Sequence, residues 1–203
     1  MDLNYKTVTI FPVPIHRFDV NGFDEIQDEL IDYVYKIKEK EPVGLVISNR
    51  GGWQSKPFNI NNEADPLHKF LIDSIGGFHV IKKEVNFVID AWANINEPNS
   101  YNIKHDHPTA DLSGVLWIKC PKACGDIVFE SPVSYQTHEE VESYTDQFKN
   151  AFNYHHSFYF TATAGTILVF PSHLNHLVKE NKSQEDRISV SFNIRLEGKP
   201  YLY

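Results

Sequence analysis

The sequence predicts a mainly β fold with flanking helices, in which two N-terminal helices pack on one face of an antiparallel sheet. Two amphipathic helical patterns precede residue 77, and from Phe78 onward the chain reads mainly as short runs that alternate apolar and polar residues. Turn signals, such as Glu-Pro-Asn-Ser at 97–100, separate these runs. Helices followed by strands are typical of this arrangement, and two facing sheets would form a jelly roll.

The length, composition and charge of the chain limit the classes of protein to which it can belong. The 203 residues fit one domain, which we expect to span 1–203, with a supporting strand and helices in 1–83 and the β core in 84–197. The net charge of −8 disfavours duplex nucleic acid as a partner, because binding there needs clustered Lys and Arg. The start lacks the apolar core of a signal peptide, and no apolar run approaches the length of about 18 residues that a membrane span needs. We therefore expect a cytoplasmic protein with no membrane partner; a homodimer is compatible with the sequence.

The N-terminal part supplies the supporting elements. Residues 7–20 are β-branched and aromatic with two prolines, which suits an edge strand. Asn21 is expected to cap a helix that ends before Pro42, and a second helix is expected to open at Asp65-Pro66 and end at Gly76-Gly77. The Gly-rich loop 45–57 between them is either a surface loop anchored by Trp53 or a lid. The apolar positions of the first helix are Phe23, Ile26, Leu30, Tyr33, Val34 and Ile37.

The C-terminal part supplies the strands. They are expected over 85–96, 101–107, 112–120, 126–130, 158–161 and 166–170, with further strands up to Ile194. Residues 131–156 are polar and are expected to be irregular. The two cysteines, Cys120 and Cys124, are interpreted as reduced structural thiols, because two more ligands at matching spacing for a metal site are missing.

The last strand has one polar and one apolar face. Alternation places Arg187, Ser189, Ser191 and Asn193 together, whereas Ile188, Val190, Phe192 and Ile194 share the other face. The apolar face needs the cover that the helices can provide. The polar face would then look into the barrel, where a bound anion could satisfy Arg187. The alternative is a strand whose polar face is in solvent.

A second polar constellation precedes it in the chain. Residues two apart in a strand point the same way, so His105 and His107 can converge on one metal ion while Asp106 points away. His176 would complete the set, and iron at such a site keeps positions open for substrate and O₂. Tyr101 has the parity of His105 and either offers its hydroxyl to the same ligand or simply packs. The alternative is three unrelated histidines.

These patterns resemble the Fe(II)/2-oxoglutarate-dependent oxygenases, whose core is a double-stranded β-helix. More narrowly, the chain is similar to small 2-oxoglutarate oxygenases found in marine bacteria and phages. The resemblance covers most of the chain. It is carried by Ser48-Asn49-Arg50-Gly51-Gly52-Trp53, His105-Asp106-His107-Pro108, Leu112-Ser113-Gly114-Val115, Phe170-Pro171-Ser172, His176, and Arg187-Ile188-Ser189-Val190-Ser191-Phe192-Asn193.

The resemblance implies an enzyme that uses Fe(II), 2-oxoglutarate and O₂. It implies that His105 and His176 bind the metal and that Arg187, assisted by Ser189, binds the distal carboxylate of 2-oxoglutarate. His107 occupies the position of the carboxylate ligand of the superfamily, which is a departure. Three histidines could hold the metal; otherwise a carboxylate comes from elsewhere. The candidates are Asp111, Asp126 and Glu130.

The expected function is a 2-oxoglutarate-dependent dioxygenase, a hydroxylase of an unidentified peptide or small molecule. One alternative is a cupin-like metal-binding protein that does not use 2-oxoglutarate, but that chemistry needs no carboxylate clamp such as Arg187 with Ser189. The other is a jelly-roll interaction module with a degenerate site. The prime substrate is not readable from the sequence: Trp53, Trp92, Trp117 and 131–156 could line a groove or merely pack.

Overall fold

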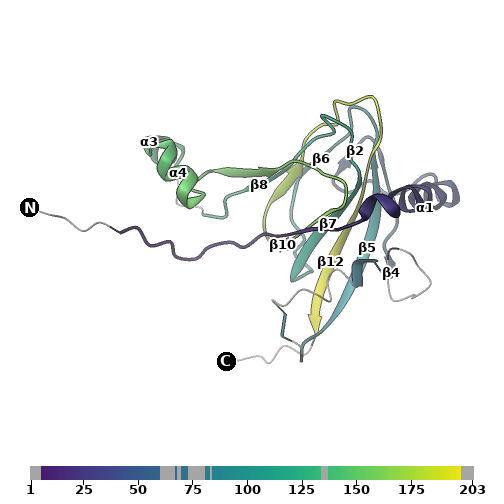
Figure 1. Ribbon diagram of the computed structural model, residues 1–203, viewed down its shortest axis with the longest axis horizontal. Coiled ribbons are helices and arrows are strands. Elements are labelled where there is room, and N and C mark those ends of the chain that lie inside the picture. The colour runs from purple at the N-terminus through teal and green to yellow at the C-terminus, as the bar shows by residue number, and fades with distance from the viewer. Residues whose placement is uncertain are drawn as a thin grey trace, which may run out of the picture.

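Two antiparallel sheets face each other and form a jelly roll (Figure 1). The computed structural model describes residues 6–59, 67, 70–72, 81–82, 84–133 and 137–197. Within this part of the chain the sheets have seven and five strands, and the paired strands are antiparallel. This is the double-stranded β-helix that the sequence predicts.

The larger sheet carries the longest strands, β5 and β12, side by side. Their register pairs Arg187 with Asn96 at one end and Glu197 with Asn86 at the other. In order across the sheet, the strands are β1 (His16–Asp19), β10 (Thr166–Pro171), β7 (Leu112–Lys119), β12 (Arg187–Glu197), β5 (Asn86–Asn96) and β3 (Trp53–Gln54), with β4 (Phe58–Asn59) also paired to β5.

The smaller sheet brings together strands that are far apart in the sequence. At its centre, β11 pairs with β6 on one side and with β8 on the other. Its strands in order are β2 (Asn49–Arg50), β6 (Tyr101–His105), β11 (His176–Val178), β8 (Ile127–Glu130) and β9 (Ser157–Phe160).

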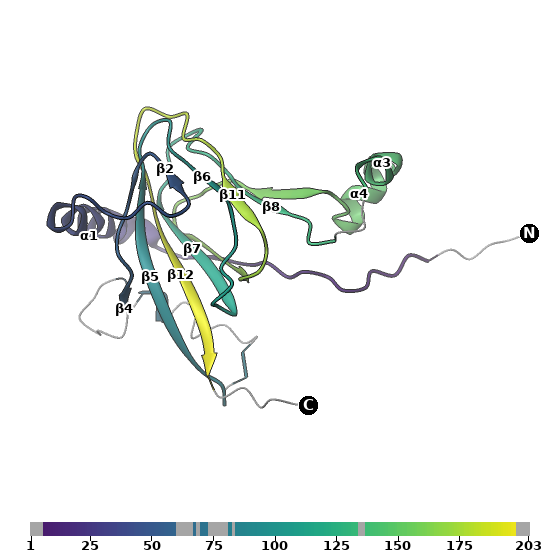
Figure 2. The same cartoon turned by 180° about the vertical axis from the view of Figure 1, so that it is seen from behind.

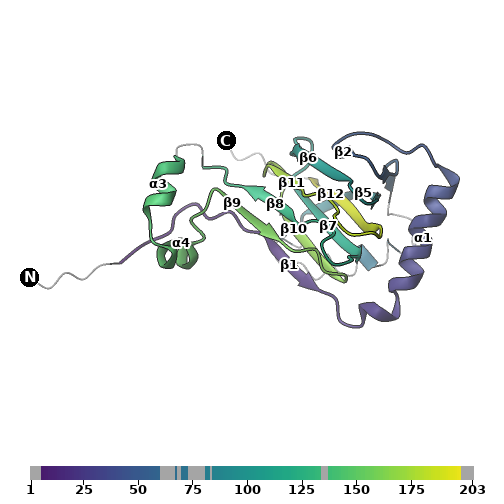
Figure 3. The ribbon, with the colours of Figure 1, turned by 90° about the horizontal axis from the view of Figure 1, so that it is seen from above.

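Helix α1 (Gln27–Lys40) packs on the face of the larger sheet that points away from the smaller sheet (Figure 3). Its Leu30 and Val34 side chains are buried there. The predicted cap at Asn21 is wrong: Gly22 adopts a left-handed conformation, φ 71°, and starts the short 3₁₀ helix η1 (Phe23–Glu25) instead. Helix α1 then begins after Ile26, with no side-chain cap.

The outer core, between the larger sheet and the helices, is built as the strand parity predicts. Ile188, Val190, Phe192 and Ile194 of β12 all lie in it, fully buried. The 3₁₀ helix η1 contributes Phe23, and α1 contributes Leu30 and Val34. Of the second predicted helix, the start at Asp65-Pro66 and the end at Gly76-Gly77 lie outside the described residues. Leu67 and Leu71, which are helical and buried, belong to this core.

The inner core fills one part of the space between the two sheets. Phe129 of β8 and Phe170 of β10 meet edge to face there, with ring centroids 4.8 Å apart. The other members are Val115, Trp117, Cys124, Ile127, Ala162, Leu168 and Leu174. The rest of the space between the sheets is the cavity described below.

The loop 45–57 joins the two sheets. Strand β2 pairs with β6 in the smaller sheet, and β3 pairs with β5 in the larger one. Gly51 and Gly52 turn the chain between them with φ of 69° and 65°, and a Cβ at Gly52 would lie 2.5 Å from the Ile95 carbonyl oxygen. Trp53 is buried and donates its indole N–H to the Glu41 carbonyl oxygen at 2.9 Å. Trp53 therefore anchors the loop, as one of the two interpretations expected.

Two short helices lie within residues 138–152, which corrects the expectation of irregular structure over 131–156. Helices α3 (His138–Ser143) and α4 (Asp146–Phe152) begin at Thr137 and Thr145, whose hydroxyls accept the N–H groups of Glu140 and Phe148. Each threonine is an N-cap, and Thr137 with Glu140 has the spacing of a capping box, a signal that could have predicted the first helix. Both helices project from the end of β8 and β9, away from the sheets (Figure 2).

The N-terminal arm, residues 6–15, extends from β1 on the same side of the molecule as α3 and α4 (Figures 1 and 3). Its Ile10 and Phe11 side chains are 68% and 88% exposed. Only 16–19 of the predicted strand over 7–20 pairs with β10, at the edge of the sheet. Among the described residues, no helix is both long and apolar enough to cross a membrane.

Candidate active site

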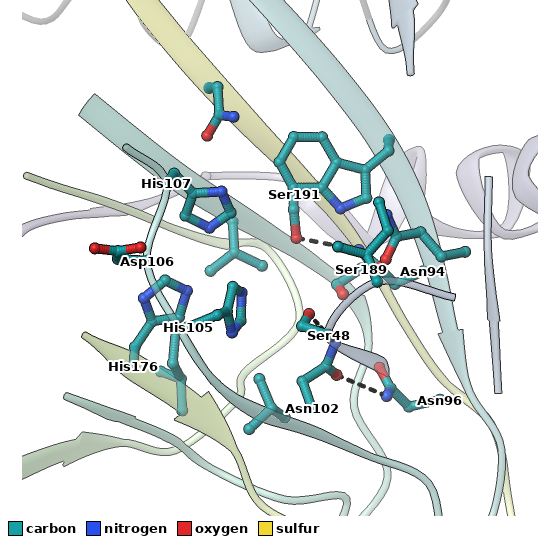
Figure 4. A pocket seen from close by; sticks show the side chains of 18 of the residues that line it. Ser48, Asn94, Asn96, Asn102, His105, Asp106, His107, His176, Ser189 and Ser191 are labelled. Atoms are coloured by element: carbon teal, nitrogen blue, oxygen red, sulfur yellow. Dashed lines mark hydrogen bonds between the residues drawn. The ribbon is translucent and has the colours of Figure 1, made fainter. Parts of the chain in front are cut away.

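A cavity of about 310 Å³ lies between the two sheets, beside the inner core. One wall is formed by β5 and β12 of the larger sheet, and the facing wall by β6 and β11 of the smaller sheet (Figure 4). The polar face predicted for the last strand is part of this lining. Arg187, Ser189, Ser191 and Asn193 all face the cavity.

Three histidines meet on the wall formed by the smaller sheet. His105 ends β6, His107 follows it, and His176 begins β11, directly opposite His105 in the strand pairing. One ring nitrogen from each lies within 4.8 Å of the others (Figure 4). The backbone N–H of His107 donates to the Ser172 carbonyl oxygen at 2.9 Å, which fixes the segment after β6 against the turn before β11.

Backbone contacts fix the tautomers of two of these rings. Nδ1 of His105 lies 2.8 Å from the Ile103 carbonyl oxygen, and Nδ1 of His176 lies 2.9 Å from the Leu174 carbonyl oxygen. A carbonyl oxygen only accepts, so Nδ1 carries the hydrogen in both rings. The lone pair of Nε2 is left free for a metal, which is the usual arrangement of metal-binding histidines.

Burial keeps the three rings uncharged. Desolvation lowers the pKa of His176 to about 3 and that of His107 to about 4, and it also lowers the pKa of His105. At neutral pH all three are therefore neutral imidazoles, the form that binds a metal.

No carboxylate of the described residues joins the three histidines. Asp106 lines the cavity beside the histidines (Figure 4), but its carboxylate is not among the atoms that meet in the cluster. The three alternative ligands are engaged elsewhere: Asp111 accepts the backbone N–H of Leu196, Asp126 pairs with Lys179, and Glu130 pairs with Lys104. The arrangement of the described residues thus favours a three-histidine set over a carboxylate from any of these positions.

Arg187 lies on the wall formed by the larger sheet and is 2% exposed. Its Nε and Nη1 groups have no hydrogen-bond partner among the described residues. Desolvation lowers its pKa from the usual value, yet an arginine remains charged in proteins. A buried guanidinium without a partner is costly, and a carboxylate that accepts from both free N–H groups would offset that cost.

A network of neutral polar groups surrounds Arg187, and it was not predicted from the sequence. Asn96 donates its side-chain amide to Asn102 at 3.1 Å, and Asn102 donates to the Ser48 hydroxyl at 3.0 Å. Asn94 donates to Ser191 at 3.1 Å (Figure 4). The alternation along β5 could have revealed this face, because Asn94 and Asn96 pair with Ser189 and Arg187.

Tyr101 does not face the cavity, which departs from the parity argument. It is 43% exposed and lies on the outer surface of the smaller sheet, whereas its neighbour Asn102 faces inward. The reason is a β-bulge: His176 pairs with His105, and Val178 pairs with Asn102, so β6 has one residue more than β11 over this stretch. Strict alternation therefore fails between Asn102 and His105.

Of the three tryptophans, only Trp92 faces the cavity. Its ring centroid lies 5.7 Å from that of His107, so it flanks the histidines. Trp53 and Trp117 are buried in the two cores. Gly114 of β7 lines the cavity with its backbone and leaves room for Phe192 of the outer core, because a Cβ there would lie 2.2 Å from the ring of Phe192 and 2.6 Å from the Leu168 carbonyl oxygen.

The residues that line the cavity fit the metal ion and the 2-oxoglutarate that the resemblance implies. Three neutral imidazoles with free ring nitrogens suit a divalent transition metal with positions left open. The unpaired, buried Arg187 on the facing wall suits a dicarboxylate that reaches from the metal to this strand. The site can thus hold a metal and an anionic ligand in one enclosed space.

Comparison with known families gives one match. The sequence model of the family described as "Putative 2OG-Fe(II) oxygenase" matches residues 90–193, more than half of the 203-residue chain. The matched region includes His105, His107, His176 and Arg187. No relative among curated protein sequences matches the chain.

Solved structures share the fold. A prolyl-4-hydroxylase of Pseudomonas putida is 13% identical with a TM-score of 0.62, covering 92% of this chain and 94% of that one. The α-ketoglutarate-dependent carbocyclase SnoK from nogalamycin biosynthesis is 12% identical with a TM-score of 0.63, covering 90% and 80%. HygX from Streptomyces hygroscopicus, with nickel and 2-oxoglutarate bound, is 8% identical with a TM-score of 0.56, covering 90% and 82%.

Proposed function

The chain belongs to the family of 2OG-Fe(II) oxygenases, and we propose that His105, His107 and His176 hold its metal while Arg187 with Ser189 holds its 2-oxoglutarate. As a member of this family the protein is a 2-oxoglutarate-dependent dioxygenase, with Fe(II) and 2-oxoglutarate as cofactors and O₂ as co-substrate. The observation that carries the residue assignment is the pairing, across one cavity, of three neutral imidazoles with a buried guanidinium that lacks a partner.

Each residue has a part in this assignment. The free Nε2 atoms of His105 and His176, with a ring nitrogen of His107, bind the metal. Arg187 donates from Nε and Nη1 to the far carboxylate of 2-oxoglutarate, and the Ser189 hydroxyl shares the same face. When bound, iron and 2-oxoglutarate supply the oxidation of a substrate C–H bond by O₂, with 2-oxoglutarate converted to succinate and CO₂.

The chain also shapes the space around these groups. Val115, Ile127, Phe170 and Val178 give the cavity an apolar part that keeps water out. The three histidine ligands are neutral, so they leave the full charge of a divalent metal uncompensated. The affinity of this site for the metal is therefore lower than that of an otherwise equal site with a carboxylate ligand. The dianionic 2-oxoglutarate supplies the missing negative charge.

The reaction assigned to the site is hydroxylation of a peptide or small molecule. Supporting this, the lining beyond Arg187 and the histidines combines neutral amides and hydroxyls with Trp92 and apolar side chains, and Asp106 is its one carboxylate among the described residues, a surface suited to a substrate that has both hydrogen-bonding and apolar groups. The fold is also that of a prolyl-4-hydroxylase. The alternatives of a cupin-like protein and of a degenerate interaction module leave the unpaired Arg187 without a purpose.

One assay tests the assignment. Succinate formed from 2-oxoglutarate is measured with Fe(II) and ascorbate, without a prime substrate, for the wild type and for His176→Ala and Arg187→Ala. We expect His176→Ala to abolish turnover and Arg187→Ala to weaken 2-oxoglutarate binding. His173→Ala is the control, because His173 is exposed and lies outside the cavity. Failure of the metal-loaded wild type to bind 2-oxoglutarate at millimolar concentration would contradict the proposal.

The homodimer that the sequence allows would form through the N-terminal arm. The exposed Ile10 and Phe11 side chains are the apolar surface that association could bury. Light scattering of the full chain and of a variant lacking the arm measures the mass of each. A dimer that persists without the arm excludes this segment as the interface.

A further inference from the structure

The two cysteines lie beside Arg187, behind the cavity wall. Strand β7 ends at Lys119, which pairs with Ile188 of β12, so the next residues on the two strands are Cys120 and Arg187. Cys124 follows after one turn and is 4% exposed, in the inner core with Ile127, a residue that lines the cavity. The proposed function does not use either thiol.

The turn after β7 brings the two thiols together. The N–H of Cys124 donates to the Pro121 carbonyl oxygen at 3.1 Å, which closes the turn between the cysteines. Cys124 is buried in the inner core and Cys120 packs against the same cluster. Both are free thiols, and Lys122 and Ala123 between them are exposed, so the turn is within reach of small molecules in solution.

Of the two cysteines, Cys124 is the one that can supply negative charge to Arg187. The neighbouring Cys124 and burial raise the pKa of Cys120 well above its usual value, so Cys120 stays a neutral thiol, and the negative groups near the guanidinium are the Cys124 thiolate and Asp126. Asp126 is already paired with Lys179 at 3.2 Å. The neighbouring Cys120 thiol, together with Arg187, lowers the pKa of Cys124 and raises its thiolate fraction. A thiolate is the form that oxidants attack.

We propose that Cys120 and Cys124 form a reversible disulfide beside the cosubstrate site, and that closing it increases the affinity of Arg187 for 2-oxoglutarate. With hydrogen peroxide as oxidant, a thiolate of the pair attacks one oxygen, the O–O bond breaks, and a sulfenic acid and hydroxide form. The second thiol then displaces the sulfenic oxygen as water. In total, two thiols lose two electrons and two protons, and one peroxide becomes two water molecules.

The direction of the coupling follows from charge. In the reduced protein the thiolate and the carboxylate of 2-oxoglutarate compete for the same buried guanidinium. The disulfide carries no charge, so Arg187 is left entirely to the cosubstrate. Because binding couplings are reciprocal, 2-oxoglutarate must lower the thiolate fraction of the pair by the same free energy. This inference rests on the proposed role of Arg187.

The first experiment tests the bond itself. The metal-free full chain is treated with hydrogen peroxide at equal concentration, and intact mass and peptide mapping locate the product. We expect the loss of two hydrogen atoms and a cross-link between Cys120 and Cys124, reversed by dithiothreitol. The variant Cys120→Ser keeps only one of the two thiols and must not form the cross-link. Peroxide treatment that yields only sulfinic or sulfonic acid, or no change, would overturn the proposal.

The second experiment tests the coupling. The dissociation constant of 2-oxoglutarate is measured by calorimetry, with Mn(II), for the reduced and oxidised wild type. We expect the oxidised form to bind at least about fivefold more tightly, the lower end of typical couplings between sites. We also expect 2-oxoglutarate to slow alkylation of the reduced pair by iodoacetamide, but not in Arg187→Gln.

The outcomes separate this inference from the proposed function. Equal 2-oxoglutarate affinity in the two redox states overturns the coupling and leaves the function intact. Absence of 2-oxoglutarate binding in both states overturns both. Cys124→Ser serves as a second variant: it cannot cross-link, so oxidant must leave its 2-oxoglutarate affinity unchanged.

Discussion

Arg187 lies directly opposite Asn96 in the pairing of β12 with β5, yet the two side chains do not hydrogen-bond. Asn96 is engaged elsewhere: its amide donates to Asn102, and its backbone carbonyl oxygen accepts from the buried side chain of Asn181 at 2.8 Å. The neighbour that could have satisfied the guanidinium is therefore held away from it. This relationship keeps Arg187 available to a ligand and motivates the first prediction.

Replacing Arg187 should weaken 2-oxoglutarate binding most. Hydrogen bonds to charged groups contribute about 1.5–3 kcal/mol each, so losing two in Arg187→Ala should raise the dissociation constant by at least about 100-fold. Arg187→Lys keeps the charge but not the paired geometry and should have a smaller effect. Calorimetry of the Mn(II)-loaded protein measures both. Arg195→Ala is the control, since Arg195 on the same strand is exposed and pairs with Asp90; an equal loss there would contradict the assignment.

The histidines can be tested by exchanging one of them for a carboxylate. His107→Asp restores the two-histidine, one-carboxylate set and should bind Fe(II) at least as tightly as the wild type, because the ligand brings a negative charge to the metal. His176→Ala should lose most of the affinity. Anaerobic titration with Fe(II) measures both. Unchanged affinity in His107→Ala would show that His107 is not a ligand.

Acid should destabilise the metal-free protein. The pKa of His107, about 4, and that of His176, about 3, lie below the unfolded value near 6.5, and that of His105 is also lowered. As pH falls below about 6.5 the unfolded chain takes up protons that the folded chain refuses, so the free energy of unfolding falls. Thermal unfolding at pH 7 and pH 5 measures this loss. In His107→Asn the loss should be smaller; an equal loss would place the acid sensitivity in other groups.

Adding a methyl group to Gly114 should destabilise the fold. In Gly114→Ala the new Cβ would meet Phe192 at 2.2 Å and the Leu168 carbonyl oxygen at 2.6 Å, contacts that require strands to move. Overpacking of this kind costs about 1–3 kcal/mol or more. Denaturant unfolding measures it. Ser113→Ala, which loses only the hydrogen bond to Asn193, should cost about 1 kcal/mol and serves as the comparison.

Tyr101 should have no role in cosubstrate binding. Its side chain is on the outer surface, so Tyr101→Phe should leave the dissociation constant of 2-oxoglutarate unchanged. Asn102→Ala should raise that constant, because it breaks the chain of hydrogen bonds from Ser48 to Asn96. A large effect of Tyr101→Phe, with none for Asn102→Ala, would contradict the outward orientation of Tyr101 and the inward orientation of Asn102 on β6.

The parts of the fold that depend on regular alternation were predictable from sequence. Strand β12 keeps strict alternation over Arg187–Glu197, so the assignment of Arg187 and Ser189 to the cavity needed only the period of two. Alternation also placed His105 and His107 together. That His176 of β11 meets them is a matter of topology, which one strand cannot reveal.

The features that were predicted wrongly or not at all depend on irregular backbone or on hydrogen-bond networks between side chains. The bulge in β6 leaves no mark that a pattern of period two detects, so Tyr101 was placed on the wrong face. Gly22 replaces Asn21 at the helix start because a left-handed residue was needed there, a requirement set by how the chain leaves β1. The amide network around Asn96 depends on three segments that meet only in the folded protein.

The bulge in β6 also bears on which changes of chain length the protein can accept. Ile103 and Lys104 both point outward between the inward-facing Asn102 and His105. Deleting Lys104 would restore plain pairing with β11 and leave both inward residues in phase. The same deletion within β12 would exchange the core and cavity faces of the strand. Insertions and deletions in relatives of this chain should therefore collect at the bulge, a few residues from the metal ligands, rather than in the strand that binds the cosubstrate.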